Sequence, residues 1–302
     1  MFRHLFPKVG DPSMLERPTP IGFIFEPKLE GTRIFIYKDH QNITIVNQKG
    51  IDITFKFPEL LDLSIYIKQE QCVLDGVLTV LKNDEPDYRL LQTREIIENP
   101  ATIRTKSKKT PATVFVFDIL EVDGCQLLTD WLKQRRQLLE KSIRESTIIK
   151  VMPSTFNGKS AWQQVKEKNY EGLIAKTLGS KYEHGENWSW LKMKNLNFAD
   201  IILAGLTEED FLLACYDQRK LRYIGKTKRR KDDKILSGYL NKKIKQLKTK
   251  ESLTKIPKSI WIKPEIIARI QYDSFQNELK NPKFLRICFD KIPEQCKIEN
   301  AI

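Results

Sequence analysis

The sequence predicts a mixed α+β domain followed by a small β-barrel domain. Before residue 195, short β-rich runs alternate with turns and amphipathic helical segments. After residue 200, short β-rich runs surround one basic helical stretch at 231–247. We therefore expect domains over 1–195 and 196–302, joined by a short hinge at 195–200. A chain of 302 residues is long enough to give each domain its own core.

Local patterns place the elements of the first domain. Two β-rich runs, 34–37 and 43–46, flank a polar turn and predict a hairpin. The proline that opens 58–63 favours a helix start. Alternation along an extended strand places Lys192 and Lys194 on one face. The remaining predictions are strands at 73–80, 114–120, 172–176 and 190–194 and a helix at 131–139.

The second domain shows strand patterns at 201–205, 211–216, 221–225 and 265–270. A domain of this size with a strongly basic composition is typical of an oligonucleotide-binding (OB) barrel. Its residues include 23 Lys+Arg and 14 Asp+Glu, a net charge of +9 out of +13 for the whole chain.

The positive charge is concentrated between Arg219 and Lys263, which contain 17 basic residues and three acidic ones. This concentration indicates a polyanionic partner, because neutralising phosphates releases condensed counterions. Nucleic acid is the favoured partner, and an anionic membrane surface is the minor alternative.

Other site classes are disfavoured by composition. The five cysteines form no C-x-x-C pair, and only three histidines are present, so a structural zinc site is not expected. The N-terminal residues do not resemble a signal peptide, and no apolar stretch is long enough to span a bilayer. We expect a soluble, cytoplasmic protein with reduced thiols that does not bind membranes.

Lys28 is the most informative single residue. In Phe25-Glu26-Pro27-Lys28-Leu29-Glu30-Gly31-Thr32-Arg33, a lysine, a carboxylate, a glycine and an arginine stand at fixed short offsets. A lysine that is desolvated or near other cations becomes a neutral amine nucleophile, and Arg33 could hold a phosphate electrophile. The simpler alternative is a lysine at the end of a strand.

Several further motifs follow in a fixed order. They are Asn47-Gln48-Lys49-Gly50 with Phe57-Pro58-Glu59-Leu60, Leu74-Asp75-Gly76, Phe117-Asp118-Ile119-Leu120, Arg135 to Glu140, Glu171 to Lys176, Trp190 to Lys194, Trp261 to Pro264, and Asn281 to Lys291. Together with Lys28 they resemble the covalent nucleotidyltransferases, most closely the small two-domain ATP-dependent DNA ligases. The resemblance implies a nucleotidyltransferase (ATP-grasp-like) domain followed by an OB-fold DNA-binding domain.

The resemblance also implies roles. Lys28 would attack the α-phosphate of ATP and carry AMP, which passes to the 5′-phosphate of nicked double-stranded DNA before the strand is sealed. The other site residues it implies are Glu26, Arg33, Phe117, Glu171, Lys192 and Lys194 for the nucleotide, Glu171 and Glu30 for Mg²⁺ (with Mn²⁺ as a substitute), and Lys49, Arg94, Lys226, Lys228, Arg229, Arg230 and Lys263 for DNA. We expect a monomer, and the sequence identifies no repair-protein partner.

Plainer interpretations exist for several of these residues. Phe117 alone would be assigned to the core. Glu171, Lys192 and Lys194 would ordinarily be solvated charges, and Arg94 a helix-surface charge. The shared context favours the functional interpretation.

Four positions depart from the family pattern: Glu30 replaces an aspartate, Gln48 an arginine, Val77 an acidic residue and Cys288 an arginine, for which Arg286 could substitute. The favoured hypothesis is an active but atypical ligase. The alternatives are a catalytically weakened homologue that binds nicked or broken DNA, and an enzyme of RNA ligation or RNA capping.

Overall fold

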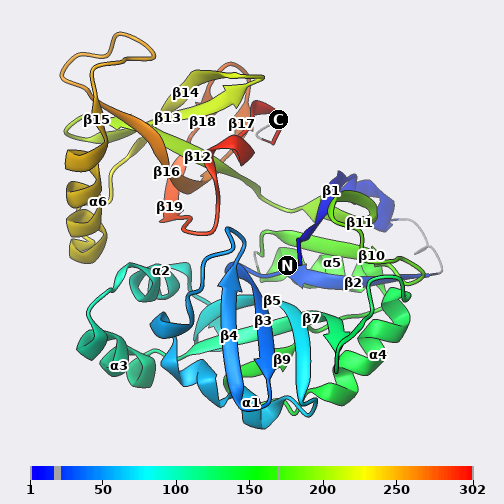
Figure 1. The fold of residues 1–302 in the computed structure, drawn as a ribbon. Helices are drawn as coiled ribbons and strands as arrows, with labels where there is room; N and C mark the ends of the chain where they lie inside the picture. The colour runs from blue at the N-terminus through cyan, green and yellow to red at the C-terminus, as the bar shows by residue number, and fades with distance from the viewer. Residues whose placement is uncertain (1, 17–21, 169, 301–302) are drawn as a thin grey trace. The chain divides into compact units, whose positions relative to one another are not determined.

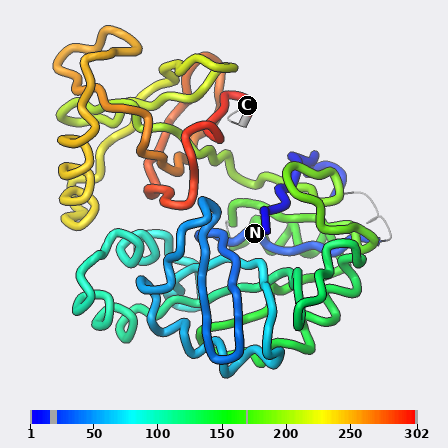
Figure 2. Tube along the Cα trace, viewed as in Figure 1, coloured from blue at the N-terminus to red at the C-terminus, as the bar shows by residue number. Residues whose placement is uncertain are grey.

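The computed structural model describes residues 2–16, 22–168 and 170–300. The chain forms two compact units (Figures 1 and 2). The first contains residues 1–91 and 98–196, and the second contains 92–97 and 197–302. None of the helices in the described residues is long and apolar enough to cross a membrane.

A seven-stranded sheet forms the base of the first unit. Its order is β4-β3-β5-β7-β8, with β6 beside β5 and β9 beside β7. The bounds are β3 Thr32–Asp39, β4 Asn42–Asn47, β5 Gln71–Lys82, β6 Glu85–Pro86, β7 Ala112–Val122, β8 Cys125–Gln126 and β9 Ile149–Val151. The expected hairpin is confirmed, because β3 and β4 pair antiparallel and turn at His40, which has a positive φ.

A second sheet of four strands has the order β1-β11-β10-β2. Its strands are β1 Leu5–Gly10, β2 Phe23–Lys28, β10 Gly172–Thr177 and β11 Gly185–Lys194. β1 is parallel to β11, so the blue N-terminal strand lies beside the green one in Figures 1 and 2. One face of this sheet packs on α5 (Gly158–Glu167) through Phe25, Leu173 and Met193.

The opposite face of the small sheet packs on the large sheet. Leu5 and Trp190 from the small sheet join Phe35, Phe115 and Phe117 from the large sheet in one buried cluster. The far face of the large sheet has its own apolar core, closed in part by α4 (Leu132–Ser142). The candidate site therefore lies between two sheets, where a rigid packed layer fixes the side chains.

The helices of this unit differ from the sequence expectation in several places. Segment 58–63 forms the 3₁₀ helix η3 (Pro58–Asp62), which continues into the single turn α1 (Leu63–Tyr66), because Pro58 starts only a short apolar stretch. α4 corresponds to the helix expected at 131–139. The elements that were not predicted are η1 Pro12–Glu16, η2 Thr54–Lys56, α2 Tyr88–Ile96, α3 Pro100–Lys109 and α5.

The second unit is an OB-type half-barrel. Its main sheet has the order β14-β13-β12-β16-β15, and β19 pairs with β16. The elements are β12 Asn197–Leu206, β13 Asp210–Asp217, β14 Lys220–Lys228, α6 Lys234–Leu247, β15 Lys248–Thr249, β16 Ile260–Tyr272, β17 Ser274–Phe275, β18 Leu279–Lys280, β19 Lys283–Ile287, η4 Pro293–Gln295 and η5 Ile298–Asn300. The side chain of Asp233 accepts a hydrogen bond from Leu236 N and caps α6.

The expected hinge at 195–200 is wrong in its extent. β12 begins at Asn197 and pairs with β16 from that residue onward. Ala199 and Ile201 are already buried in the barrel core. Only 195–196 remain between the strands β11 and β12, since burial of alternate side chains extends the strand into the segment expected to be a linker.

Candidate functional site

Three neighbouring strands bring a lysine pair to one level of the small sheet. Gly172 on β10 is opposite Lys28 on β2 and Lys194 on β11. Because opposed residues share a face, both lysines extend from the same side. A Cβ on Gly172 would overlap the carbonyl oxygen of Met193, so glycine permits the close approach of β11.

Glu171 lies directly before β10 and reaches Lys28. Lys28 Nζ donates to Glu171 Oε2 at 2.5 Å, and the Glu171 side chain is 5 % exposed. Burial lowers the pKa of Lys194, and the negative charge of Glu171 opposes this shift. Lys28, the expected nucleophile, is therefore in contact with Glu171, which is expected to bind the nucleotide and Mg²⁺.

Glu26 lies two residues before Lys28, on the same face, and is buried between two cations. Its carboxylate forms an ion pair with Lys176 Nζ at 2.6 Å and accepts a hydrogen bond from Arg136 Nη1 at 2.9 Å. Arg136 also donates to the Met152 carbonyl. Burial raises the pKa of Glu26 and lowers that of Lys176, and each charge opposes the shift of the other.

Phe117 is buried at 6 % exposure, beneath this charged layer. It is the extra residue where the register of β7 against β5 shifts, since Asp118 is opposite Asp75 and Val116 is opposite Gly76. Lys176 Nζ lies 4.2 Å from the ring centroid of Phe117. Phe117 is therefore a core residue directly below the site, and its role as a nucleotide contact stays a prediction.

Arg33 is bound to Asp75 by a two-pronged ion pair. Nε donates to Oδ1 at 3.1 Å and Nη2 to Oδ2 at 2.7 Å. Burial alone would raise the pKa of Asp75, but the Arg33 guanidinium and His4 hold it well below its usual range. Arg33 Nη1 also donates to the Leu5 carbonyl at 2.5 Å.

A second buried ion pair fixes α4 to the large sheet. Arg135 donates to both oxygens of Asp118, at 2.8 and 3.0 Å, and both side chains are fully buried. This pair satisfies the aspartate of the Phe117-Asp118 motif within the protein. Its role is structural: it positions β7 next to the site.

The structure brings most of the expected nucleotide residues to one place. Lys28, Glu26 and Lys194 are on one face of the small sheet, and Lys192 shares it because it is opposite Ile174, which is opposite Glu26. The Arg33 guanidinium lies 5.2 Å from the Phe117 ring centroid.

Two of the four departures from the family pattern, Val77 and Glu30, lie at the loop that follows Lys28. A Cβ on Gly31 would overlap the side chain of Val77 and the Leu78 carbonyl, so Val77 borders this loop directly. Glu30 in the same loop is half-buried, whereas Lys49 is exposed.

Cys288 is a core residue of the second unit. It is 3 % exposed, and its Sγ lies 3.5 Å from Asp200 Oδ1. Arg286 is 1 % exposed. Its side chain is therefore enclosed in the barrel, and its substitution for the arginine of the motif stays a prediction.

The expected DNA-binding residues occupy different environments. Lys226, Lys228 and Lys263 are exposed, and the first two donate to Asp210 at 2.9 and 3.2 Å. Arg229 is partly buried and donates to the Thr207 carbonyl at 3.1 Å, and Arg230 reaches the Phe284 carbonyl at 3.4 Å.

Arg94 differs most from its expected position. Its side chain is 1 % exposed, in the segment 92–97 that is grouped with the second unit. A buried guanidinium does not present itself to a phosphate backbone. The expectation of a surface charge at Arg94 is therefore wrong in this structure.

Sequence reasoning missed three residues that contact the predicted ones: Lys176, Arg136 and Tyr182. Alternation along β10 would have placed Lys176 on the same face as Gly172 and Ile174. Arg136 lies in the motif at 135–140, for which the sequence predicted no contact with Glu26. Tyr182 lies in a loop, where no periodic signal exists.

The chemistry available at this site is phosphoryl transfer to an amine. An amine nucleophile, an adjacent carboxylate and several fixed cations are the groups that such a displacement needs. The described residues contain no group of three or more His, Cys, Asp or Glu side chains that could hold a metal by themselves. A metal at Glu171 would need further oxygen ligands from a substrate, as is usual for Mg²⁺ with phosphates.

Family models match both units. The model "ATP dependent DNA ligase domain" matches residues 10–194, and "ATP dependent DNA ligase C terminal region" matches 207–291. The mycobacterial structure "DNA ligase D complexed with ATP and MES" has a TM-score of 0.69 at 22 % identity and covers 97 % of each chain, which supports the fold.

Curated relatives include a Thermococcus fumicolans DNA ligase, 25 % identical over 90 % of this chain. The Mycolicibacterium smegmatis multifunctional non-homologous end joining protein LigD is also 25 % identical over 90 % of this chain. The chain spans 52 % and 36 % of these two proteins. The SPbeta prophage-derived DNA ligase-like protein LigB of Bacillus subtilis is 30 % identical over 65 % of this chain and 70 % of its own length.

Proposed function

The chain belongs to the ATP-dependent DNA ligase family, and we propose that it seals 5′-phosphate/3′-hydroxyl nicks in duplex DNA through a lysyl-AMP intermediate on Lys28. The observation that carries the proposal is the contact of Lys28 with Glu171, beside Lys194 on one sheet face. A conserved fold alone would not require this cluster of charges around a lysine.

The first step joins Lys28 Nζ to the α-phosphorus of ATP. The bond between the α-phosphorus and its bridging oxygen breaks, and pyrophosphate leaves. Lys28 must lose a proton to attack, and Glu171 Oε2 is within hydrogen-bond reach to receive it. Arg33, Lys192 and Lys194 would stabilise the phosphate charge, and Phe117 with Glu26 would form the adenosine side of the site.

The next two steps transfer AMP and close the strand. A 5′-phosphate oxygen at the nick displaces Lys28 from the AMP phosphorus. The 3′-hydroxyl then attacks the 5′-phosphate, forms the phosphodiester and releases AMP. Each step is a displacement at phosphorus, so one set of cations can serve all three.

A divalent cation fits the acidic residues only together with substrate. Glu171 is the best ligand candidate and Glu30 the second, with ATP phosphates as the other oxygen ligands. Bound Mg²⁺, or Mn²⁺ in its place, would neutralise phosphate charge. Proton transfer from Lys28 and stabilisation of the phosphate charge remain with Glu171 and with the cations Arg33, Lys192 and Lys194.

The second candidate function is a catalytically weakened ligase homologue that binds nicked DNA. Val77 beside the nucleophile loop, Gln48 and the buried Cys288 favour it, because none supplies the charge that the family pattern has there. Under this alternative the DNA-binding surface functions and Lys28 does not react.

Intact-mass measurement after incubation with ATP and Mg²⁺ separates the two. We expect an AMP adduct on the wild type and none on Lys28→Ala, with DNA affinity largely retained in the variant. Absence of an adduct on the wild type, while a control ligase is adenylylated, would reject the enzyme. Replacing ATP by GTP and nicked DNA by nicked RNA tests the RNA-processing alternatives.

A further inference from the structure

Strand β1 is connected to the candidate site through the hydroxyl of Tyr182. Tyr182 lies in the loop between β10 and β11 and is 3 % exposed. Its hydroxyl accepts from Leu5 N at 3.1 Å and donates to Asp75 Oδ2 at 2.7 Å. Arg33 Nη2 approaches the same hydroxyl at 3.5 Å. One phenol thus links β1, β5 and β3.

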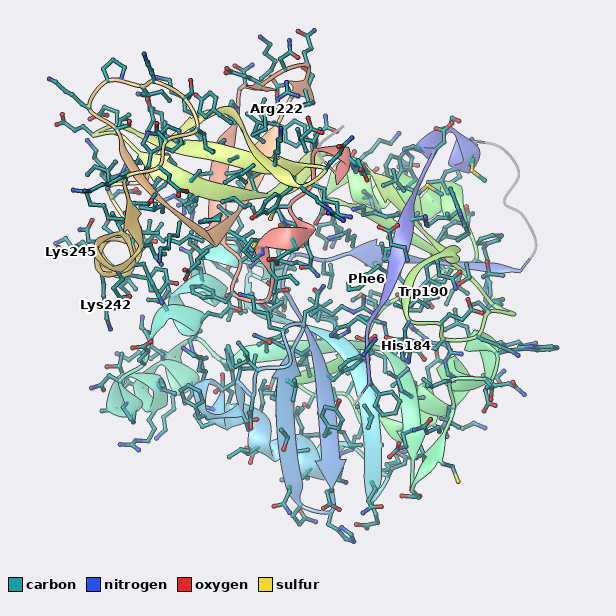
Figure 3. The ribbon with its side chains drawn as sticks, turned by 45° about the horizontal axis from the view of Figure 1, so that its top comes forward. Phe6, His184, Trp190, Arg222, Lys242 and Lys245 are labelled. Carbon is teal, nitrogen blue, oxygen red and sulfur yellow. The ribbon has the colours of Figure 1, made fainter. Side chains whose placement is uncertain are left out.

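Aromatic rings and hydrogen bonds together define the orientation of Arg33. Its guanidinium carbon lies 5.6 Å from the ring centroid of Phe6 and 5.2 Å from that of Phe117. Figure 3 shows Phe6 on β1 in the same region as Trp190. Asp75 and the Leu5 carbonyl accept hydrogen bonds from the guanidinium. A planar guanidinium held in this way has little freedom to rotate.

Tyr182 supports both of these acceptors. Asp75 Oδ2 accepts from Arg33 Nη2 and from the Tyr182 hydroxyl, each at 2.7 Å. Leu5 contacts both residues: its carbonyl accepts from Arg33 Nη1, and its N–H donates to the Tyr182 hydroxyl. Burial raises the pKa of Tyr182 well above its usual value, so the phenol remains a neutral donor.

We propose that Tyr182 is a positioning residue that orients Arg33, through Asp75 and Leu5, for the phosphate chemistry at Lys28. The inference rests on the proposed function, because that function assigns Arg33 to a phosphate. Tyr182 acts without touching the nucleotide. β1 thereby becomes part of the site, since its backbone supplies one acceptor for Arg33.

Tyr182→Phe tests the hydroxyl while keeping the ring. The ring packs edge-on to Trp190 at 6.1 Å and under Arg135 at 5.8 Å, and phenylalanine preserves both contacts. We expect the single-turnover rate of AMP-adduct formation to fall about tenfold, the effect of one or two hydrogen bonds, with the KM for ATP little changed. Tyr66→Phe on α1 removes a phenolic hydroxyl elsewhere in the same unit and should leave the rate unchanged.

A double-mutant cycle separates positioning from general destabilisation. If Tyr182 acts through Arg33, Tyr182→Phe should have little further effect in an Arg33→Lys background, because lysine cannot form the fork with Asp75. If the rate losses of the two single variants multiply in the double variant, the two residues act independently and the inference is overturned. An AMP adduct on the wild type would still support the proposed ligase function in that case. Absence of the adduct on the wild type would overturn the proposed function and this inference with it.

Discussion

Lys28 Nζ lies 2.5 Å from Glu171 Oε2, although 143 residues separate them in the chain. Pairing of β2 with β10 creates this contact, because Gly172 is opposite Lys28. The nucleophile candidate therefore has a carboxylate partner that depends on sheet register. A change at Glu171 should consequently affect chemistry more than folding.

Glu171→Gln keeps the size of the side chain and removes its charge. We expect the rate of AMP-adduct formation to fall by about two orders of magnitude, because the amide can neither accept the Lys28 proton nor bind a cation as strongly. Quantification of the adduct over time by intact mass measures this. A variant that forms the adduct at the wild-type rate would remove Glu171 from the mechanism.

Gly172→Ala tests the close approach of β10 and β11. The new Cβ overlaps the Met193 carbonyl oxygen, so β11 must shift and carry Lys194 away from Lys28. We expect adduct formation to slow by at least about tenfold. Gly179→Ala is the matched control, since a Cβ there meets no atom within 4 Å. Equal rates in the two variants would contradict the importance of this register.

Val77→Glu tests whether the missing carboxylate limits the rate. Val77 contacts the glycine of the nucleophile loop, so a glutamate there would extend next to Lys28 and its substrate. We expect nick sealing to accelerate about tenfold or more. Val77→Gln adds the same bulk without charge and should not accelerate it. Unchanged or lower sealing by the glutamate variant would count against this account.

Asp75→Asn should destabilise the first unit, because it leaves the partly buried Arg33 guanidinium without the fully buried carboxylate that is its charge partner. Breaking a buried ion pair in this way costs about 3–5 kcal/mol. The pKa of Asp75 is lowered in the folded state, so its contribution is complete above the unfolded value of about 3.9 and is lost as the pH falls below it. Urea unfolding at pH 7 and pH 3.5 measures this effect. The difference in the free energy of unfolding between wild type and variant should be smaller at pH 3.5 than at pH 7. An equal gap at both values would contradict the ion-pair explanation.

The parts of the site that could be predicted from the sequence were those marked by strand alternation or by ordered motifs. Alternation along β11 placed Lys192 and Lys194 correctly on one face, and ordered motifs identified the family. Neither signal reports contacts made by loops, so Tyr182 was missed. The burial of Arg94 depends on tertiary packing, which helix periodicity does not encode. The hinge was assigned too long because polar residues at the start of β12 resemble a linker until its partner strand is known.

The basic surface of α6 provides the last prediction, which concerns DNA rather than nucleotide. Lys242 and Lys245 are exposed on this helix and project from it (Figure 3). From 234 to 258 the sequence contains eight lysines and one acidic residue. We therefore expect α6 to contribute to the binding of phosphates.

The variant Lys242→Glu/Lys245→Glu should weaken binding to nicked duplex and flatten its salt dependence. Each lost phosphate contact reduces the slope of log K against log salt by about one. Fluorescence anisotropy across a salt series measures the slope, and AMP-adduct formation without DNA should be unaffected. The matched control is Lys133→Glu/Lys141→Glu on α4, which changes net charge equally at exposed positions. If both double variants lower the slope alike, net charge rather than α6 governs DNA binding.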